Sequence, residues 1–167
     1  MNVTHILIDD ANPLHRELPI YRSGQINAVR LSDGDYRTYA SLDISAHDMA
    51  ALFHYGVIEA MNSLRFISES GKGLDSWDEA FLPSGQLPAM LRIIGDGIEA
   101  ISQKEPERVL LGWHEVPEEN RLAPDGVPEG IAYWREIDPG KAVDFLGRLT
   151  DFATDAAEKG FDLEFIL

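Results

Sequence analysis

Two short segments combine aromatic rings with groups that can move a proton. Trp113-His114-Glu115 and Tyr133-Trp134-Arg135-Glu136 both lie in apolar runs typical of β-strands. If these strands pair, the rings could stack on a sugar, with Glu115 and Glu136 as acid and base or His114 as base. Alternation places Trp113 and Glu115 on one face and His114 on the other. Such cross-strand pairs are also ordinary stabilisers of a sheet.

The histidines do not form a metal-binding pattern. His47 and His54 are seven residues apart in a segment of helical periodicity, which separates them by about 10 Å along the helix axis. No His-Glu-x-x-His element is present. We expect both side chains to be solvated, on the side of the helix away from its apolar stripe. The chain has no cysteine, which excludes disulfides and thiolate sites. We expect no metal and no cofactor.

The segment Ile6–Leu14 places Asp9 and Asp10 directly after an apolar run. It resembles the opening of a response-regulator receiver domain, in which paired acidic residues at the end of the first strand hold Mg²⁺. A receiver domain also needs a phosphoacceptor aspartate at the end of its third strand. The corresponding region here, Met49–Ala60, has helical periodicity instead. We therefore reject a receiver domain and expect two carboxylates at the exposed end of a strand.

Two acidic connections carry large rings and are the best candidates for a partner-binding surface. Rings supply buried area in an interface, and carboxylates steer a positively charged partner and fix its register. The first connection contains a tryptophan among acidic residues, and the second follows Trp113. The predicted partner-binding residues are Asp75, Trp77, Asp78, Glu79, Glu115, Glu118 and Glu119.

The charge of the chain is its least ordinary bulk property. Its 167 residues include 29 Asp+Glu against 14 Lys+Arg, giving a formal net charge of -15. Such a surface repels nucleic-acid phosphates and anionic lipid, and it attracts basic proteins. The alternative is that the acidity only keeps the protein in solution. We expect a basic protein partner, no nucleic acid and no membrane, and we leave the oligomeric state open.

The first residues predict a cytoplasmic location. Met1–His5 contains no basic region, and the apolar run Ile6–Ile8 ends at Asp9, unlike a signal peptide. No apolar run approaches the roughly 18 residues that span a membrane.

Caps, turns and periodicity define the expected elements. Ser45 is a helix N-cap, Asp138-Pro139 opens another helix, and Gly160 closes it. A hairpin turn at Gly95–Gly97 is the alternative to a helix over 88–104, and Asp75–Phe81 could form one helical turn. The expected strands are Asn2–Ile8, Gln25–Leu31, Tyr36–Asp43, 108–116, 131–137 and 161–167, with a hairpin turn at Ser32–Asp35. The expected helices are Ala46–Phe66, 88–104 and 139–159.

This order of elements predicts a single α+β domain over residues 1–167. We expect an antiparallel or mixed sheet of about five or six strands, with three helices packed mainly on one face. The favoured function is an acidic, non-catalytic binding protein that neutralises a basic partner such as a toxin domain, as bacterial immunity proteins do. The alternatives are a structural or assembly subunit, and a small enzyme or ligand-binding domain with its site on the Trp113/Tyr133/Trp134 sheet face.

Overall fold

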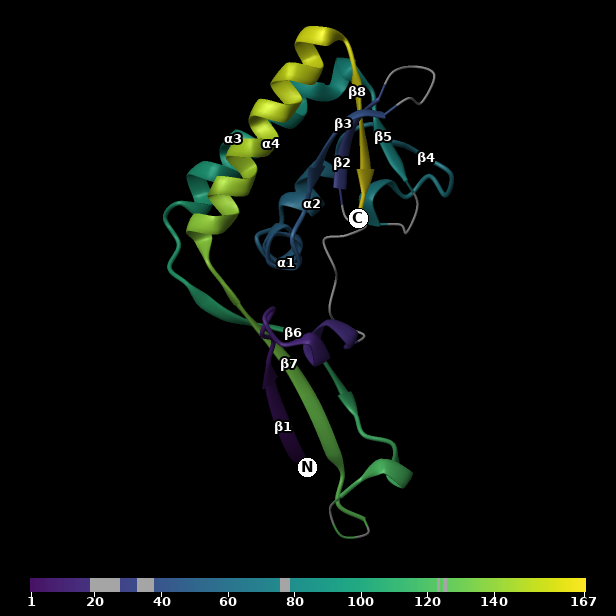
Figure 1. Cartoon of the computed structure of the whole chain (residues 1–167), viewed down its shortest axis with the longest axis vertical. Helices are drawn as coiled ribbons and strands as arrows, with labels where there is room; N and C mark the ends of the chain where they lie inside the picture. Colours follow the sequence, from purple (N-terminus) through teal and green to yellow (C-terminus); the bar gives the residue numbers. More distant parts are fainter. Residues whose placement is uncertain (19–27, 33–37, 76–78, 123, 125) are drawn as a thin grey trace. The chain divides into compact units, whose positions relative to one another are not determined.

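The chain forms two compact units, each built from segments that are distant in the sequence (Figure 1). The computed structural model describes residues 1–18, 28–32, 38–75, 79–122, 124 and 126–167. Unit 1 contains Met1–Arg22 and Pro106–Ile137, and unit 2 contains Ser23–Glu105 and Asp138–Leu167. The predicted α+β class is confirmed, but the described residues form two sheets instead of one, and four α-helices instead of three.

Unit 1 is a three-stranded mixed sheet. Its elements are β1 (Asn2–Leu7), η1 (Pro13–Glu17), β6 (Glu107–Glu115), η4 (Glu118–Asn120) and β7 (Glu129–Ile137). The strand order is β1-β7-β6, with β1 parallel and β6 antiparallel to the central β7. The β6–β7 ladder shifts register between Leu110 and Gly112, so Leu111 has no partner in it and forms a bulge.

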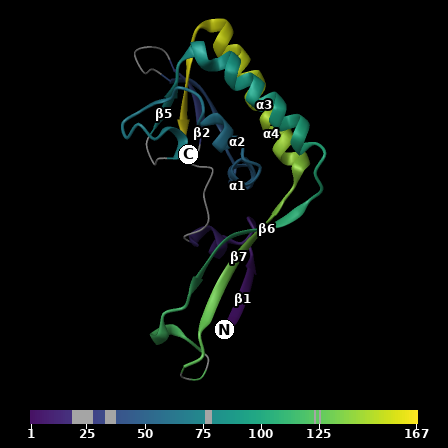
Figure 2. The same cartoon turned by 180° about the vertical axis from the view of Figure 1, so that it is seen from behind.

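Unit 2 pairs an antiparallel sheet with helices. The strands β2 (Ala28–Ser32), β3 (Thr38–Asp43), β4 (Ile67–Ser68), β5 (Ala80–Leu82) and β8 (Asp162–Ile166) lie in the order β3-β2-β8-β5-β4. The helices are α1 (Ala46–His54), α2 (Val57–Met61), α3 (Leu87–Ile101) and α4 (Pro139–Lys159), and short turns form η2 (Gly73–Asp75) and η3 (Ser84–Gln86). Figures 1 and 2 show α3 and α4 side by side, and their fully buried residues include Met90, Ile94, Phe145 and Leu146. Burial of each such side chain stabilises the folded state by about 2 kcal/mol.

Glycines explain where the expected helices were right and wrong. The single helix predicted over Ala46–Phe66 is wrong, because Gly56 adopts φ 74° and separates α1 from α2. In α3 the helix continues through Gly95 and Gly97, so the alternative hairpin is wrong. A Cβ atom at Gly97 would lie 3.5 Å from Val57 Cγ2, an ordinary van der Waals distance, so α3 packs against α2 at this position.

Most of the other expected elements are confirmed within about three residues, although the expected starts at Gln25 and Tyr36 lie outside the described residues. Asp138 and Gly160 cap α4 as predicted, with φ 70° at Gly160. The antiparallel pairing of β2 and β3 is confirmed, whereas their predicted turn at Ser32–Asp35 lies largely outside the described residues. The helical turn that Asp75–Phe81 could form lies partly outside the described residues, and its last two residues belong to the strand Ala80–Leu82. None of the helices in the described ranges is long and apolar enough to cross a bilayer.

Candidate functional site

One face of the unit 1 sheet carries aromatic and aliphatic side chains. The register places Leu7 and Leu110 on either side of Trp134, and His5 and Trp113 on either side of Ala132. Directly paired residues point to the same side of a sheet, and alternate residues of one strand share a face. This surface, called the aromatic face below, consists of Val3, His5, Leu7, Leu110, Trp113, Ala132 and Trp134.

The aromatic face is exposed. Trp113 is 56% exposed and Leu110 is 46% exposed, and Val3 and Leu7 are also exposed. Met1 lies beside this face and is exposed as well. A contiguous apolar patch of this kind marks a site of interaction more often than an isolated exposed apolar residue does.

Gly130 seats the largest ring of the aromatic face. A Cβ atom at this position would lie 3.6 Å from Trp113 Cε3 and 3.4 Å from Met1 Sδ. Both distances are ordinary van der Waals contacts, so Trp113 and Met1 lie against β7 at Gly130. The indole ring is 56% exposed in this position.

The aromatic face contains a pocket of about 290 Å³, lined by His5, Leu7, Arg108 and Trp134. Trp134 Nε1 donates a hydrogen bond to His5 Nδ1 over 3.0 Å. Arg108 Nε lies 3.3 Å from Glu136 Oε1, its cross-strand neighbour. The lining of the pocket therefore combines the apolar surfaces of Leu7 and Trp134 with the polar nitrogens of His5 and Arg108.

The opposite face of the sheet holds Tyr133 and His114. Tyr133 is buried there, and its ring stacks on His114 with 5.6 Å between centroids. The structure thus separates Tyr133 from Trp113 and Trp134, which the sequence analysis grouped on one sheet face. Alternation, which placed Trp113 and His114 on different faces, holds.

Glu115 and Glu136 do not form an acid–base pair. Glu115 is opposite Gly130, six residues along β7 from Glu136, which corresponds to about 20 Å. Glycoside hydrolysis needs its two carboxyl groups within roughly 10 Å of each other. Each carboxylate instead lies beside an arginine: Glu115 Oε1 is 2.7 Å from Arg121 Nη2, and Glu136 is beside Arg108.

The connection between β6 and β7 is held in shape by its own polar contacts. Arg121, whose side chain is mostly buried, donates to Val116 O over 2.9 Å and to Glu115. The backbone N–H of Leu122 donates to Glu129 Oε2 over 3.1 Å. These contacts present the exposed carboxylates of Glu118 and Glu119, and the side chain of Leu122, which is 97% exposed.

The other predicted partner-binding residues belong to unit 2. Trp77 and Asp78 lie outside the described residues, and Asp75 ends η2. Glu79 is exposed and hydrogen-bonds with Glu164 of β8. The structure therefore assigns the two predicted acidic connections to different units, and the group around Trp113 is the one whose rings are described.

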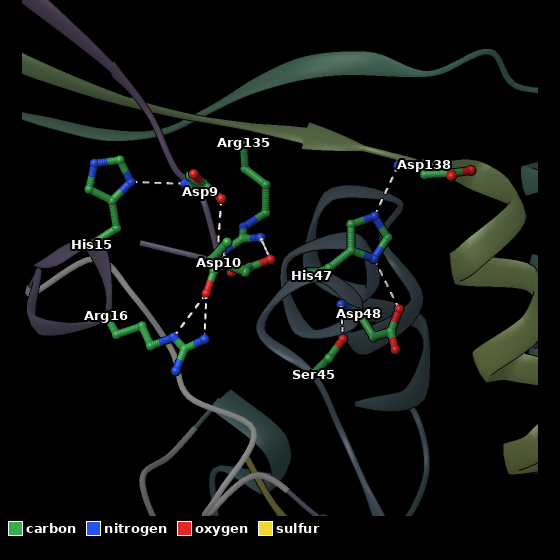
Figure 3. A network of polar contacts seen from close by, with 10 residues as sticks. Asp9, Asp10, His15, Arg16, Ser45, His47, Asp48, Arg135 and Asp138 are labelled. Atoms are coloured by element: carbon green, nitrogen blue, oxygen red, sulfur yellow. Dashed lines mark hydrogen bonds and ion pairs between the residues drawn. The ribbon is translucent and has the colours of Figure 1, made fainter. Parts of the chain in front are cut away.

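Asp9 and Asp10 organise the end of β1 (Figure 3). The Arg135 guanidinium, 5% exposed, contacts both carboxylate oxygens of Asp10 at 2.9 and 3.0 Å. Arg16 donates to the backbone oxygen of Asp10, and the Asp9 N–H donates to His15 Nδ1. The paired acidic residues thus tie η1 and β7 to the end of β1.

His47 is buried, which contradicts the expectation that it is solvated. Its Nδ1 lies 3.0 Å from Asp48 Oδ1, and its Nε2 accepts from the backbone N–H of Asp138 over 2.9 Å (Figure 3). The burial arises because Asp138, the N-cap of α4, covers the first turn of α1. Since Nε2 already accepts a hydrogen bond, the proton lies on Nδ1 and points at Asp48. The pair joins two helix N-termini and has no free ring nitrogen for catalysis.

A buried carboxyl group lies in the centre of the unit 2 sheet. The side chain of Glu164 is 7% exposed, and Arg30 Nη1 lies 3.9 Å from its Oε2. Burial raises the pKa of the Glu164 carboxyl above its ordinary value of 4.5. The hydrogen bond and negative charge of Glu79 raise this pKa further, whereas Arg30 lowers it. Glu164 therefore keeps its proton to a higher pH when folded than when unfolded.

We expect Glu164→Gln to remove part of the pH dependence of stability. A raised pKa in the folded state means that the stabilisation is complete below the ordinary pKa and is lost as the pH rises through the folded value. The wild-type free energy of unfolding should therefore fall as the pH rises above about 4.5, and that of the variant should fall less. Urea unfolding across this range measures both slopes. The exposed change Glu158→Gln is the control, and equal slopes for wild type and Glu164→Gln would refute the assignment.

Several residues of the aromatic face escaped the sequence analysis. Val3, Leu7 and Leu110 are not among the residues that the sequence predicts to bind a partner. The alternation of Val3, His5 and Leu7 was a usable signal, since it places two aliphatic residues on one face of β1. Nothing in the sequence indicated that this face would be exposed.

Comparison of the chain with protein-family models, with curated proteins and with solved structures gives no match.

Proposed function

We propose that the chain is a non-catalytic binding protein that docks on a basic protein through the aromatic face. The observation that carries the proposal is the exposed apolar patch with Trp113 seated over Gly130. Burial of apolar surface contributes about 25 cal/mol per Å², and interface hot spots are enriched in tryptophan. A partner that covers this face gains both contributions.

Charge favours a basic partner over a second copy of the chain. Trp113 and Glu115 are on the same end of β6 as the β6–β7 connection, which adds Glu118 and Glu119. Two copies facing each other here would bring these carboxylates together, and each copy carries a net charge of -15. Lysines and arginines on the partner would instead meet them and accelerate the encounter.

The docking mode suggests inhibition as its outcome. A partner whose basic surface performs its function, such as a nuclease-like toxin domain, is neutralised when that surface is covered. Small, acidic bacterial immunity proteins act on their cognate toxin domains in this way. Steric occlusion by the apolar patch and electrostatic complementarity at its rim are sufficient for this mechanism, and no catalytic group is required.

The test begins by isolating the partner. The immobilised chain captures proteins from its source cells, and the captured protein is purified and titrated against the wild-type chain. The proposal requires a basic protein that binds the isolated chain. An acidic partner, or a stable dimer of the chain in light scattering that buries Trp113, would overturn the assignment of the face.

We expect Glu118→Lys together with Glu119→Lys to slow association with this partner. Both carboxylates are exposed, so the change acts mainly on long-range attraction, and we expect about a tenfold lower association rate at low salt. The dependence of that rate on ionic strength should flatten as well. Stopped-flow measurements at several salt concentrations give both quantities.

The matched control changes the same amount of charge elsewhere. Asp151 and Glu158 are exposed on α4 in unit 2, and their replacement by lysine should change the association rate much less. An unchanged rate in the Glu118/Glu119 variant would remove these residues from the binding surface. An equal loss in both variants would assign the effect to net charge alone.

A further inference from the structure

We infer that the pocket of the aromatic face binds a carboxylate carried on an apolar or aromatic body. The pocket lies within the proposed docking face, but the inference goes beyond that function because the ligand can be a free acid as well as a protein C-terminus. Four side chains from three strands line the pocket: His5, Leu7, Arg108 and Trp134.

The apolar part of the ligand is selected by Leu7 and Trp134. These residues are direct neighbours in the parallel ladder of β1 and β7. Their side chains offer an aliphatic surface beside an indole ring, which suits a benzyl-sized or branched aliphatic group. The volume of about 290 Å³ is at the small end of ligand pockets, so it suits one side chain or one small acid.

The carboxylate is selected by His5 and Arg108. Because Trp134 Nε1 donates to His5 Nδ1 over 3.0 Å, the neutral imidazole carries its proton on Nε2 and can donate there. A guanidinium group binds a carboxylate through two parallel hydrogen bonds. Among the described residues, His5 and Arg108 offer donors to the pocket and no carboxylate lines it, so an acceptor is favoured over a cation.

Glu136 competes with the ligand for Arg108. Their contact uses Arg108 Nε at 3.3 Å, and both side chains are 64% exposed. An exposed ion pair of this kind contributes little to stability. A carboxylate seated in the pocket can therefore displace Glu136 at small cost.

The experiment titrates the chain with 3-phenylpropionate and, as the matched neutral probe, 3-phenylpropanamide. The readout is the indole N–H signal of Trp134 in a nitrogen–proton NMR spectrum, assigned from its loss in Trp134→Phe. We expect saturable shifts with the acid and none with the amide at the same concentrations. Equal binding of the amide would overturn the inference.

Two variants of the salt bridge separate a binding role of Arg108 from a structural one. Arg108→Gln should weaken binding of the acid by about tenfold or more, since it removes a charged hydrogen-bond donor. Glu136→Gln should strengthen it, because the competing carboxylate is lost. If the salt bridge is merely structural, Arg108→Gln and Glu136→Gln should change the affinity for the acid in the same direction. That result would overturn the inference. Arg92→Gln, exposed on α3, is the control and should bind as wild type does.

A second titration, with peptides, identifies the source of the carboxylate. A tripeptide that ends in phenylalanine is compared with its C-terminally amidated form. Tighter binding of the free peptide than of 3-phenylpropionate supports a partner's C-terminus as the ligand, and weaker binding supports a free acid. If no acid binds but Trp113 variants still lose the protein partner, the pocket inference fails and the docking function stands. If acids bind and the Trp113 variants still bind the protein partner, the docking function is refuted and the pocket inference stands.

Discussion

Replacing Trp113 with serine lowers affinity for the basic partner by about thirtyfold, the loss typical of a tryptophan hot spot. The ring is 56% exposed in the free chain, so the loss comes from the interface and only slightly from the fold. The ring lies beside Gly130, on the aromatic face. Isothermal titration with the purified partner measures the change, and urea unfolding measures the stability of the variant.

The control for this prediction is Ile67→Ser. Ile67 is 60% exposed on β4 of unit 2, so this substitution removes an exposed apolar side chain from a different surface. We expect wild-type affinity for this variant. A Trp113→Ser variant that binds within about twofold of wild type would show that the ring is not a hot spot.

Local sequence signals were sufficient for most elements. Ser45 and Asp138 accept from backbone N–H groups at the starts of α1 and α4, and Gly160 ends α4 in a left-handed conformation. These predictions succeed because a cap depends on groups within a few residues. Gly56 carried the same signal, but the apolar stripe that continues past it suggested a single long helix.

The composition of the aromatic face depends on a feature that alternation does not reveal. Leu110 and Trp113 are three residues apart, so a regular strand would place them on opposite faces. The bulge at Leu111 reverses the alternation, and both residues come to the same face. The pairing of β1 with β7 joins residues more than one hundred positions apart, and no local pattern specifies such a partner.

The burial of His47 could not be predicted for the same reason. Helical periodicity compares residues along one element, and by that measure His47 lies away from the apolar stripe. Its partner Asp138 is 91 positions away along the chain. A polar residue is buried when another element brings matching hydrogen-bond groups, and here those groups come from a neighbouring residue and a distant helix cap.

The second large effect is on stability: Asp48→Ala lowers the free energy of unfolding by about 3 kcal/mol. Asp48 is 7% exposed and accepts from His47 Nδ1, while Arg148 Nη2 lies 3.9 Å from its other oxygen. The alanine variant leaves the imidazole N–H buried without an acceptor. Asp48→Asn keeps an acceptor oxygen and should lose less. Urea unfolding followed by circular dichroism measures all variants.

Asp144→Ala separates the buried hydrogen bond from the charge near Arg148. Asp144 lies 3.5 Å from the Arg148 guanidinium, but its side chain is 76% exposed. Exposed pairs of this kind contribute at most about 1 kcal/mol, so we expect only a small loss. Equal losses in Asp144→Ala and Asp48→Ala would assign the stabilisation to the charge of Arg148, which lies near both aspartates, and not to the hydrogen bond between Asp48 and His47. A larger loss in Asp48→Ala than in Asp48→Asn would place the stabilisation in that hydrogen bond.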